Sequence, residues 1–130
     1  MTTFEPGAPL PELRVTPDRF LTYRYAGASG DFNPIHLDDD FARMVGMPSR
    51  ILHGLWSMAQ VARAQTEAAG DPAALASLSV QFRGMGVPEQ EVVVSSSVAD
   101  VLDDGTVLID CEASQGDSAL VRSGRAELRP

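Results

Sequence analysis

An aspartate and a histidine stand five positions apart, as Asp31 and His36, in a stretch rich in turn-forming residues. Gly30 tolerates a positive φ, and Pro34 forces Asn33 out of the helical region, so we expect a loop of fixed shape. A carboxylate and an imidazole at one point can divide the taking and giving of a proton, each role contributing about 10²–10⁴-fold to a rate. The sequence therefore predicts a site that handles one water molecule.

Each of these two residues also has a structural interpretation. Asp31 is of a type that caps turns, and a single His36 is compatible with a partly buried histidine whose hydrogen bonds are satisfied. The wider string of residues around the pair separates the two interpretations.

That string resembles the signature of the MaoC-like dehydratases and (R)-specific enoyl-CoA hydratases. The positions that carry the resemblance are Tyr25, Ser29-Gly30-Asp31, Asn33-Pro34-Ile35-His36 and Ala42, followed by Ile51-Leu52-His53-Gly54. In its length and its Gln81-Phe82-Arg83 segment the chain is most similar to the small single-domain members. Among these it resembles the catalytic subunit of actinobacterial (3R)-hydroxyacyl-carrier-protein dehydratases.

The resemblance implies roles for five residues. Asp31 and His36 would be the catalytic pair and share a bound water, while Asn33 would order the loop and bond the pair or the substrate. Gly54 would offer its backbone N–H, at a helix N-terminus, to the thioester oxygen. His53 belongs to the same substrate-facing segment, although a structural histidine that donates to a backbone carbonyl is the favoured interpretation.

The phosphates of coenzyme A or of a carrier protein require cations. Arg83 and Arg122 are the main candidates, with Arg50 and Arg125 as further ones, although for any one of them a solvated surface residue is the favoured interpretation. No His-Glu-x-x-His, Gly-x-Gly-x-x-Gly, Walker or Gly-x-Ser-x-Gly motif is present. We therefore expect no metal and no cofactor, the substrate being carried as a thioester.

Composition narrows the function further. A chain of 130 residues is the size of one domain, spanning 1–130. A net charge of −8 argues against binding to nucleic acid or to anionic membranes, which need a dense cationic face. The single Cys111 excludes a disulfide within the chain. With no signal-peptide pattern and no apolar run near about 18 residues, we expect a cytoplasmic protein.

Helices are expected in the first half of the chain. Thr16-Pro17-Asp18 predicts a helix start, and Ser29-Gly30 its end. The acidic residues 38–40 predict a short helix that stops at Gly46. The longest helix is expected from Leu55 to Ala69, surrounded by the sheet. One predicted apolar face comprises Leu55, Met58, Ala59, Ala62 and Thr66, and Trp56, Val61 and Ala64 widen the apolar surface beyond it.

From Leu75 onward the apolar pattern changes to period two, which indicates four strands. Hairpin turns are predicted at 86–89, 103–105 and 116–118, so the strands should form an antiparallel meander. One long helix followed by such strands indicates an α+β architecture with the sheet curled around the helix, and the resemblance implies the hotdog fold. Because open sheet edges favour pairing, we expect a homodimer or a heterodimer with a related hotdog subunit.

Three functions are compatible with this pattern. The first is a hydratase or dehydratase acting on acyl-CoA or acyl-carrier-protein thioesters. The second is a hotdog acyl thioesterase, which would place an acidic residue on the central helix, where this chain has none before Glu67. The third is a non-catalytic acyl-binding subunit of a heterodimeric dehydratase, which should have lost Asp31 or His36.

Overall fold

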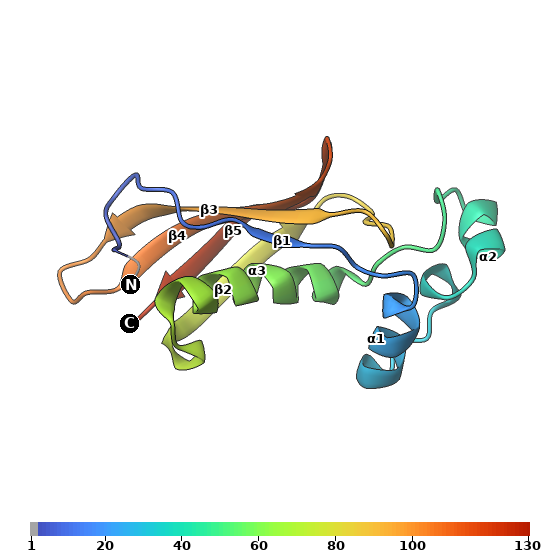
Figure 1. Ribbon diagram of the computed structural model, residues 1–130, viewed down its shortest axis with the longest axis horizontal. Coiled ribbons are helices and arrows are strands. Elements are labelled where there is room, and N and C mark those ends of the chain that lie inside the picture. Colours follow the sequence, from blue (N-terminus) through green and yellow to red (C-terminus); the bar gives the residue numbers. More distant parts are fainter. Residues whose placement is uncertain (1–2) are drawn as a thin grey trace.

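Five antiparallel strands form one sheet in the order β1-β3-β4-β5-β2 in the computed structural model, which describes residues 3–130. The strands are β1 (Leu13–Val15), β2 (Leu75–Phe82), β3 (Val92–Val101), β4 (Val107–Gln115) and β5 (Ser118–Leu128). A single long helix, α3 (Gly54–Ala69), lies along one face of the sheet (Figure 1). This arrangement confirms the α+β class and the hotdog fold.

Helix α3 begins at Gly54 and ends before Gly70, as predicted from the sequence. Its N-cap is His53, and Gly70 ends it in the left-handed region with a φ of 72°, which glycine adopts without strain. Among residues 3–130, no helix combines the length and the apolar character needed to cross a bilayer.

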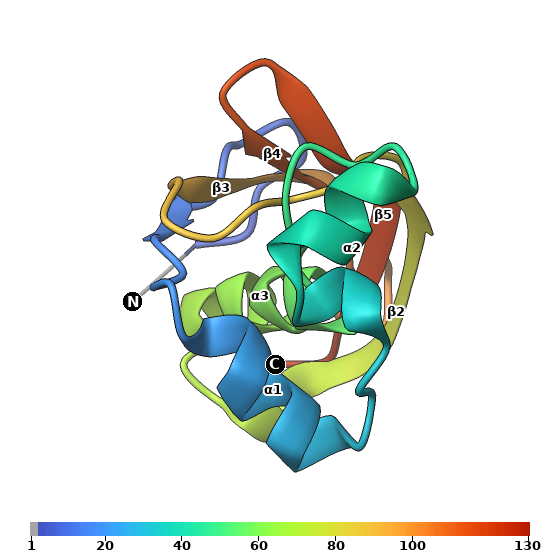
Figure 2. The ribbon, with the colours of Figure 1, turned by 90° about the vertical axis from the view of Figure 1, so that its right-hand side faces the viewer.

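The apolar surface predicted for α3 was only partly right, since its wider part, Trp56, Val61 and Ala64, is buried while the stripe that begins at Leu55 is not. The residues that the helix buries are Trp56, Ser57, Val61, Ala64, Gln65 and Ala68. Leu55 is instead 62% exposed, and Ala59 is exposed too. Alanines occur on several sides of this helix, so they do not indicate which side is buried. The larger side chains of Trp56 and Val61 decide which side packs against the sheet. The sheet itself curls around α3 as predicted, since β2, β3, β4 and β5 all contact the helix (Figure 2).

The predicted meander is only partly right. β3, β4 and β5 do form consecutive hairpins, but β2 pairs with β5 and not with β3. Residues 86–89 therefore cross from one side of the sheet to the other and form no hairpin. The N-terminal segment contributes β1, a strand not among the four predicted, which pairs with β3 from Leu13↔Val94 to Val15↔Val92.

The alternation along β3 and β4 is confirmed. The residues of these strands predicted to face the core are buried, namely Val92, Val94, Val98, Val107, Ile109, Cys111 and Ala113. Burial raises the pKa of the Cys111 thiol to about 11, which is the behaviour of an unreactive core cysteine. The sheet is thus a rigid apolar layer against which α3 packs.

Three short helices cluster beyond the N-terminal end of α3 (Figures 1 and 2). They are α1 (Leu21–Ser29), η1 (Pro34–His36) and α2 (Asp39–Met44). Helix α1 begins four residues later than Thr16-Pro17 predicted, because the Asp18 carboxylate accepts from Phe20 N–H at 2.8 Å and holds a turn ahead of the helix. Helix α2 has Asp38 as its N-cap, as the acidic triplet indicated.

Candidate active site

The loop between α1 and η1 takes its shape from its own side chains. Ser29 Oγ donates to Tyr25 O at 2.8 Å and accepts from Asp31 N–H at 3.2 Å. Asp31 Oδ1 then accepts from Asn33 N–H, and Asn33 Oδ1 accepts from Ile35 N–H, both at 3.2 Å. These successive turns of the Asx and ST type fix the bend that the sequence predicted.

The structure brings Asp31 and His36 together. Asp31 Oδ2 lies 3.6 Å from His36 Nε2, and the His36 side chain is 8% exposed while that of Asp31 is 52% exposed. His36 Nδ1 lies 2.8 Å from the backbone oxygen of Ile51. Because a carbonyl oxygen only accepts, Nδ1 carries the proton and neutral His36 presents the lone pair of Nε2 to Asp31.

A gap of 3.6 Å is longer than a direct hydrogen bond, and it suits a bridging water. A water oxygen about 2.8 Å from both atoms completes two good hydrogen bonds. One such water would contact the Asp31 carboxylate and the His36 lone pair at the same time. The arrangement can therefore position a water and take a proton from it.

The position of His36 depends on a contact distant in sequence. Ile51 N–H donates to Ile35 O at 2.9 Å, while Leu52 N–H donates to Gly86 O at 2.8 Å. Residues 51–53 thus lie between the loop and the crossover that follows β2. This bridging segment fixes the carbonyl that orients His36, and it carries the chain directly into α3.

His53 is 3% exposed and lies behind the pair. Its ring stacks on that of His36 with centroids 3.8 Å apart and planes 18° apart. Burial lowers the pKa of His53, an effect opposed in part by its hydrogen bond to Asp31 and reinforced by the nearby His36. His53 therefore favours the neutral form. Sequence reasoning missed the stack, since nothing in the local pattern shows that residues 36 and 53 meet.

A metal site at these residues is a separate question. One ligand atom each from Asp31, His36 and His53 lies within 4.8 Å of the other two. The lone pair of an imidazole nitrogen lies in its ring plane, so two nearly parallel stacked rings direct their lone pairs along separate planes. Both rings would have to turn before they could bind one ion, and the geometry favours an acid–base pair.

Gly54 is the first residue of α3, so its N–H has no partner within the helix. Among residues 3–130 no backbone acceptor for this N–H is found. A Cβ on Gly54 would lie 3.3 Å from the Phe82 ring, so glycine lets this half-exposed aromatic side chain lie against the helix start. The candidate site thus combines a free amide and an apolar surface with the Asp31–His36 pair.

The candidate phosphate ligands divide into two groups. Arg50 and Arg125 are engaged: Arg50 bonds Asp39 at 2.9 Å, and Arg125 bonds Asp110 at 2.9 Å. Arg83 and Arg122 have no carboxylate within ion-pair distance in the described part of the chain. Arg83 donates to Gln81, which pairs with Arg122 across β2 and β5. The structure therefore leaves these two guanidiniums exposed and close together on the sheet.

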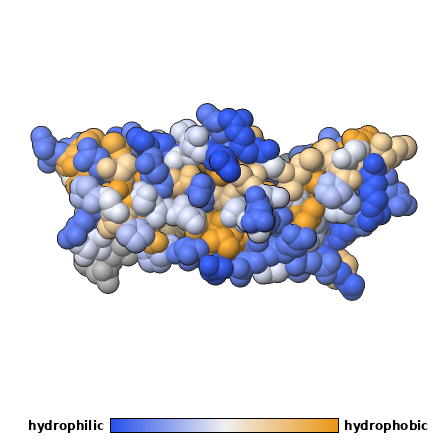
Figure 3. Space-filling view, turned by 90° about the horizontal axis from the view of Figure 1, so that it is seen from above, coloured by the Kyte–Doolittle hydropathy of each residue, from blue (hydrophilic) through white to orange (hydrophobic). Residues whose placement is uncertain are grey.

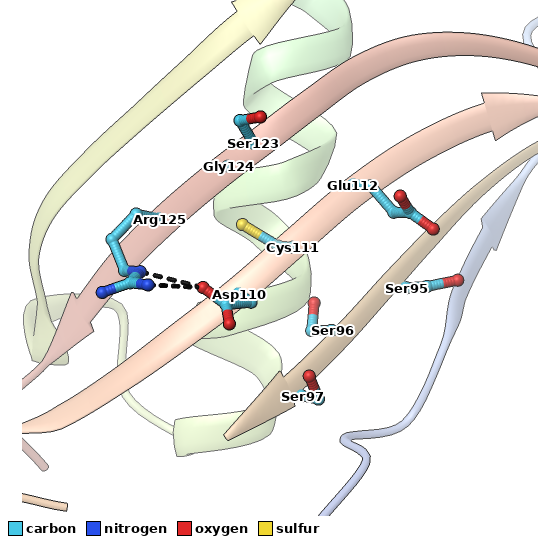
Figure 4. A pocket seen from close by; sticks show the side chains of 9 residues that line it. All are labelled: Ser95, Ser96, Ser97, Asp110, Cys111, Glu112, Ser123, Gly124 and Arg125. Carbon is cyan, nitrogen blue, oxygen red and sulfur yellow. Dashed lines mark hydrogen bonds and ion pairs between the residues drawn. The ribbon is translucent and has the colours of Figure 1, made fainter. Parts of the chain in front are cut away.

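Another polar region lies on the face of the sheet that points away from α3. We call it the outer groove, a hollow of about 600 Å³ lined by Ser95, Ser96, Ser97, Asp110, Cys111, Glu112, Ser123, Gly124 and Arg125 (Figure 4). Seen from above, hydrophilic side chains extend over the length of this face and hydrophobic ones form separate small groups (Figure 3). Of the residues predicted to act on substrate, Arg125 alone is among these lining residues, and there it is paired with Asp110.

Comparison with known proteins decides the family. The family model described as a MaoC like domain matches residues 5–117. The chain belongs to this family. The MaoC-like loop string found in the sequence is thus part of a match that covers most of the chain.

Related sequences include two enoyl-CoA hydratases. The enoyl-CoA hydratase ChsH3 of Mycobacterium tuberculosis is 35% identical over 127 residues, covering 92% of this chain and 41% of that protein. The peroxisomal enoyl-CoA hydratase 2 of Arabidopsis thaliana is 36% identical over 84 residues, covering 63% of this chain and 26% of that protein. The MaoC-like chain therefore spans less than half the length of these relatives.

Solved structures share the fold. A MaoC-like dehydratase superposes with a TM-score of 0.92 at 23% identity, covering 96% of this chain and 40% of that one. A chain of the ChsH1-ChsH2 complex from Mycobacterium tuberculosis gives 0.86 at 25% identity, covering 97% and 98%. The (R)-hydratase from A. caviae involved in PHA biosynthesis gives 0.87 at 20% identity, covering 99% and 98%.

Proposed function

We propose that this protein is an (R)-specific hydratase or dehydratase of trans-2-enoyl and (3R)-3-hydroxyacyl thioesters, carried on coenzyme A or acyl carrier protein, and that it needs no cofactor. The observation that carries the proposal is the distance of 3.6 Å between Asp31 Oδ2 and His36 Nε2. The hydrogen bond of Nδ1 to Ile51 O leaves Nε2 as the nitrogen that can accept a proton. The enoyl-CoA hydratases among the related sequences support it.

In the hydration direction, the water oxygen adds to C3 of the enoyl thioester. In this step His36 takes one proton from the water while Asp31, in its protonated form, gives one proton to C2, so the pair ends with as many protons as it began with. The two groups share a water and titrate as a unit, so the roles belong to the pair more than to either member. Dehydration is the same path in reverse.

Negative charge develops on the thioester oxygen during this addition. The Gly54 N–H is proposed to stabilise it, aided by the positive end of the α3 dipole. Asn33 keeps the loop in shape through its bond to Ile35 N–H, and its amide nitrogen remains to bond the pair or the substrate.

The phosphates of the carrier are proposed to contact Arg83 and Arg122. These guanidiniums carry no ion pair in the described structure, and Arg83 directly follows Phe82, whose ring lies against Gly54. The Phe82 ring offers an apolar surface beside the start of α3.

A second hotdog subunit is proposed to complete the site. Strands β1 and β2 are the edges of the sheet, and the Leu55 side of α3 is exposed in the single chain. The fold match to a chain of the ChsH1-ChsH2 complex supports a paired assembly, as a homodimer or with a related subunit.

The test is loss of enoyl absorbance with crotonyl-CoA and longer trans-2-enoyl-CoA homologues, with chiral analysis of the product. We expect turnover to the (3R)-hydroxyacyl thioester at one or more chain lengths. Absence of turnover at every length, both alone and with a co-expressed related hotdog subunit, would overturn the proposal. Thiol release measured in the same reactions separates hydration from thioester hydrolysis, which α3 does not favour because it has no acidic residue before Glu67.

A further inference from the structure

His53 touches both members of the candidate pair. Its Nε2 lies 3.0 Å from the backbone oxygen of Asp31, and its ring stacks on His36 at 3.8 Å. Tyr25 closes the other side, with ring centroids 4.7 Å apart and planes at 49°. His53 is therefore enclosed by Tyr25, Asp31 and His36, the three titratable groups in contact with it.

The contact with Asp31 fixes the tautomer of His53. The backbone oxygen of Asp31 only accepts, so Nε2 of His53 carries the proton and donates it. This N–H is committed to a carbonyl and is not free to act on a thioester oxygen. His53, which the sequence analysis grouped with the substrate-binding residues, thus uses this N–H to contact the loop.

Asp31 depends on this contact for its place. The other hydrogen bonds of Asp31 stay inside the loop, with Ser29 Oγ and with Asn33 N–H. Among residues 3–130, His53 supplies the hydrogen bond that ties Asp31 to the start of α3, since the His36 contact is a 3.6 Å approach of side chains. The bonds of Ile35 and His36 to Ile51 hold only the far end of the loop, so without the His53 bond the part around Asp31 could keep its internal turns and still move away from α3.

The charge state of His53 suits the same purpose. Burial lowers the pKa of His53 and so favours the neutral ring, which places no positive charge 3.8 Å from the imidazole that is proposed to accept a proton. A protonated His53 would oppose that step by like-charge repulsion. A buried, neutral, hydrogen-bonded ring can therefore support the pair without competing with it.

We propose that His53 is a positioning residue that, through Nε2–H, anchors the Asp31 backbone to the start of α3 and so sets the distance between the Asp31 carboxylate and His36. This inference rests on the proposed function for its effect on rate. It predicts that losing the bond lowers kcat and leaves KM nearly unchanged, because the loss misplaces reacting groups and removes no substrate contact.

Three substitutions separate the hydrogen bond from the ring. In His53→Gln, the amide nitrogen lies near the place of Nε2 and can still donate to Asp31 O. In His53→Asn, a similar amide is one methylene too short. In His53→Phe, the stacked ring remains but the donor is lost. The Gln and Asn variants are matched in polarity, so their difference reports the reach of the donor.

The expected kcat of His53→Gln on an active enoyl-CoA is within about fivefold of wild type, whereas His53→Asn and His53→Phe lose about 10–10²-fold with KM changed less than about threefold. Normal kcat in His53→Asn or His53→Phe would overturn the proposal. So would a loss in His53→Gln as large as that in His53→Asn.

A second measurement does not depend on turnover. In ¹⁵N-labelled protein, the amide signals of Asp31, Phe32 and Asn33 should shift and broaden in His53→Asn and return toward their wild-type positions in His53→Gln. Unchanged signals in His53→Asn would overturn the anchoring role even if the enzyme is active. If wild-type protein turns over no thioester, the proposed reaction fails, and these signals still decide whether His53 anchors the loop.

Discussion

The two polar regions of this molecule differ in the way their charged groups are held. In the active-site region, the His36 side chain is 8% exposed, and a backbone carbonyl fixes its proton. In the outer groove, Asp110 and Arg125 pair at 2.9 Å while both side chains remain more than half exposed. The outer groove has a volume of about 600 Å³, but the buried and oriented imidazole of His36 lies outside it. Volume alone is therefore a poor guide to chemistry here.

The largest expected effect comes from removing either member of the pair. Asp31→Asn and His36→Gln should each reduce hydration by at least about 10²-fold, because each removes a group that handles the proton. The matched controls are Asp110→Asn and Glu112→Gln in the outer groove, which should keep wild-type rates. Circular dichroism should be unchanged in all four. A comparable loss in the groove variants would erase the distinction between the two regions.

A smaller effect is expected at the exposed arginines. Arg83→Gln and Arg122→Gln should each raise KM for an enoyl-CoA by about 2–5-fold at low salt, since partly solvated ion contacts are weak. The same enoyl group on pantetheine, which lacks phosphate, should show no change. Arg125→Gln in the outer groove is the matched control. Equal KM shifts with pantetheine would remove the two arginines from phosphate binding.

Much of this site was visible in the sequence, because loop shape depends on neighbours. Gly30, Asn33 and Pro34 act through short-range backbone preferences, and these placed Asp31 and His36 correctly. The contact of His53 with Asp31 spans 22 residues and depends on the bridge from Ile51 to Ile35, for which the local pattern holds no signal. Tertiary packing alone brings these parts together.

The same division applies to the fold. Gly54 and Gly70 marked the ends of α3, because helix termination is local. The pairing of β2 with β5 was not predictable from alternation, since a strand with one apolar face fits either neighbour. β1 has three residues, too few for a periodic pattern.

Stability should respond to the ion pair that supports the active-site region. Arg50 bonds Asp39 through its backbone and its guanidinium, and it also donates to Arg19 O, which joins α2 to the segment before α1. The hydrogen bond from the Arg50 backbone, followed by the Arg50 charge, lowers the pKa of Asp39. Because the pKa is lowered in the folded state, the pair stabilises the fold at pH values above the unfolded-state pKa of about 3.9. This stabilisation is lost as the pH falls through the folded-state pKa of Asp39.

Asp39→Asn should therefore lower the melting temperature by a few degrees at pH 7, for a loss of about 1 kcal/mol. Its difference from wild type should shrink below about pH 4. Asp110→Asn, which breaks the exposed pair of the outer groove, should change the melting temperature less. A pH-independent difference for Asp39→Asn would show that the carboxylate charge is not what Arg50 requires.

The smallest effect concerns the floor of the outer groove. Cys111 is buried with a pKa of about 11, so its thiol should resist a disulfide reagent at pH 8 in folded protein and react fully in guanidinium chloride. Rapid labelling of the native protein would indicate that the outer groove opens down to the core, and the contrast with the enclosed His36 would then be weaker.

The most direct test of the central claim is a double-mutant cycle on hydration by wild type, Asp31→Asn, His36→Gln and the double variant. Groups that share one water act as a unit, so the double variant should lose no more than about tenfold beyond the worse single variant. Losses that multiply in full would contradict the account, because they would mean that Asp31 and His36 act on separate steps and hold no common water.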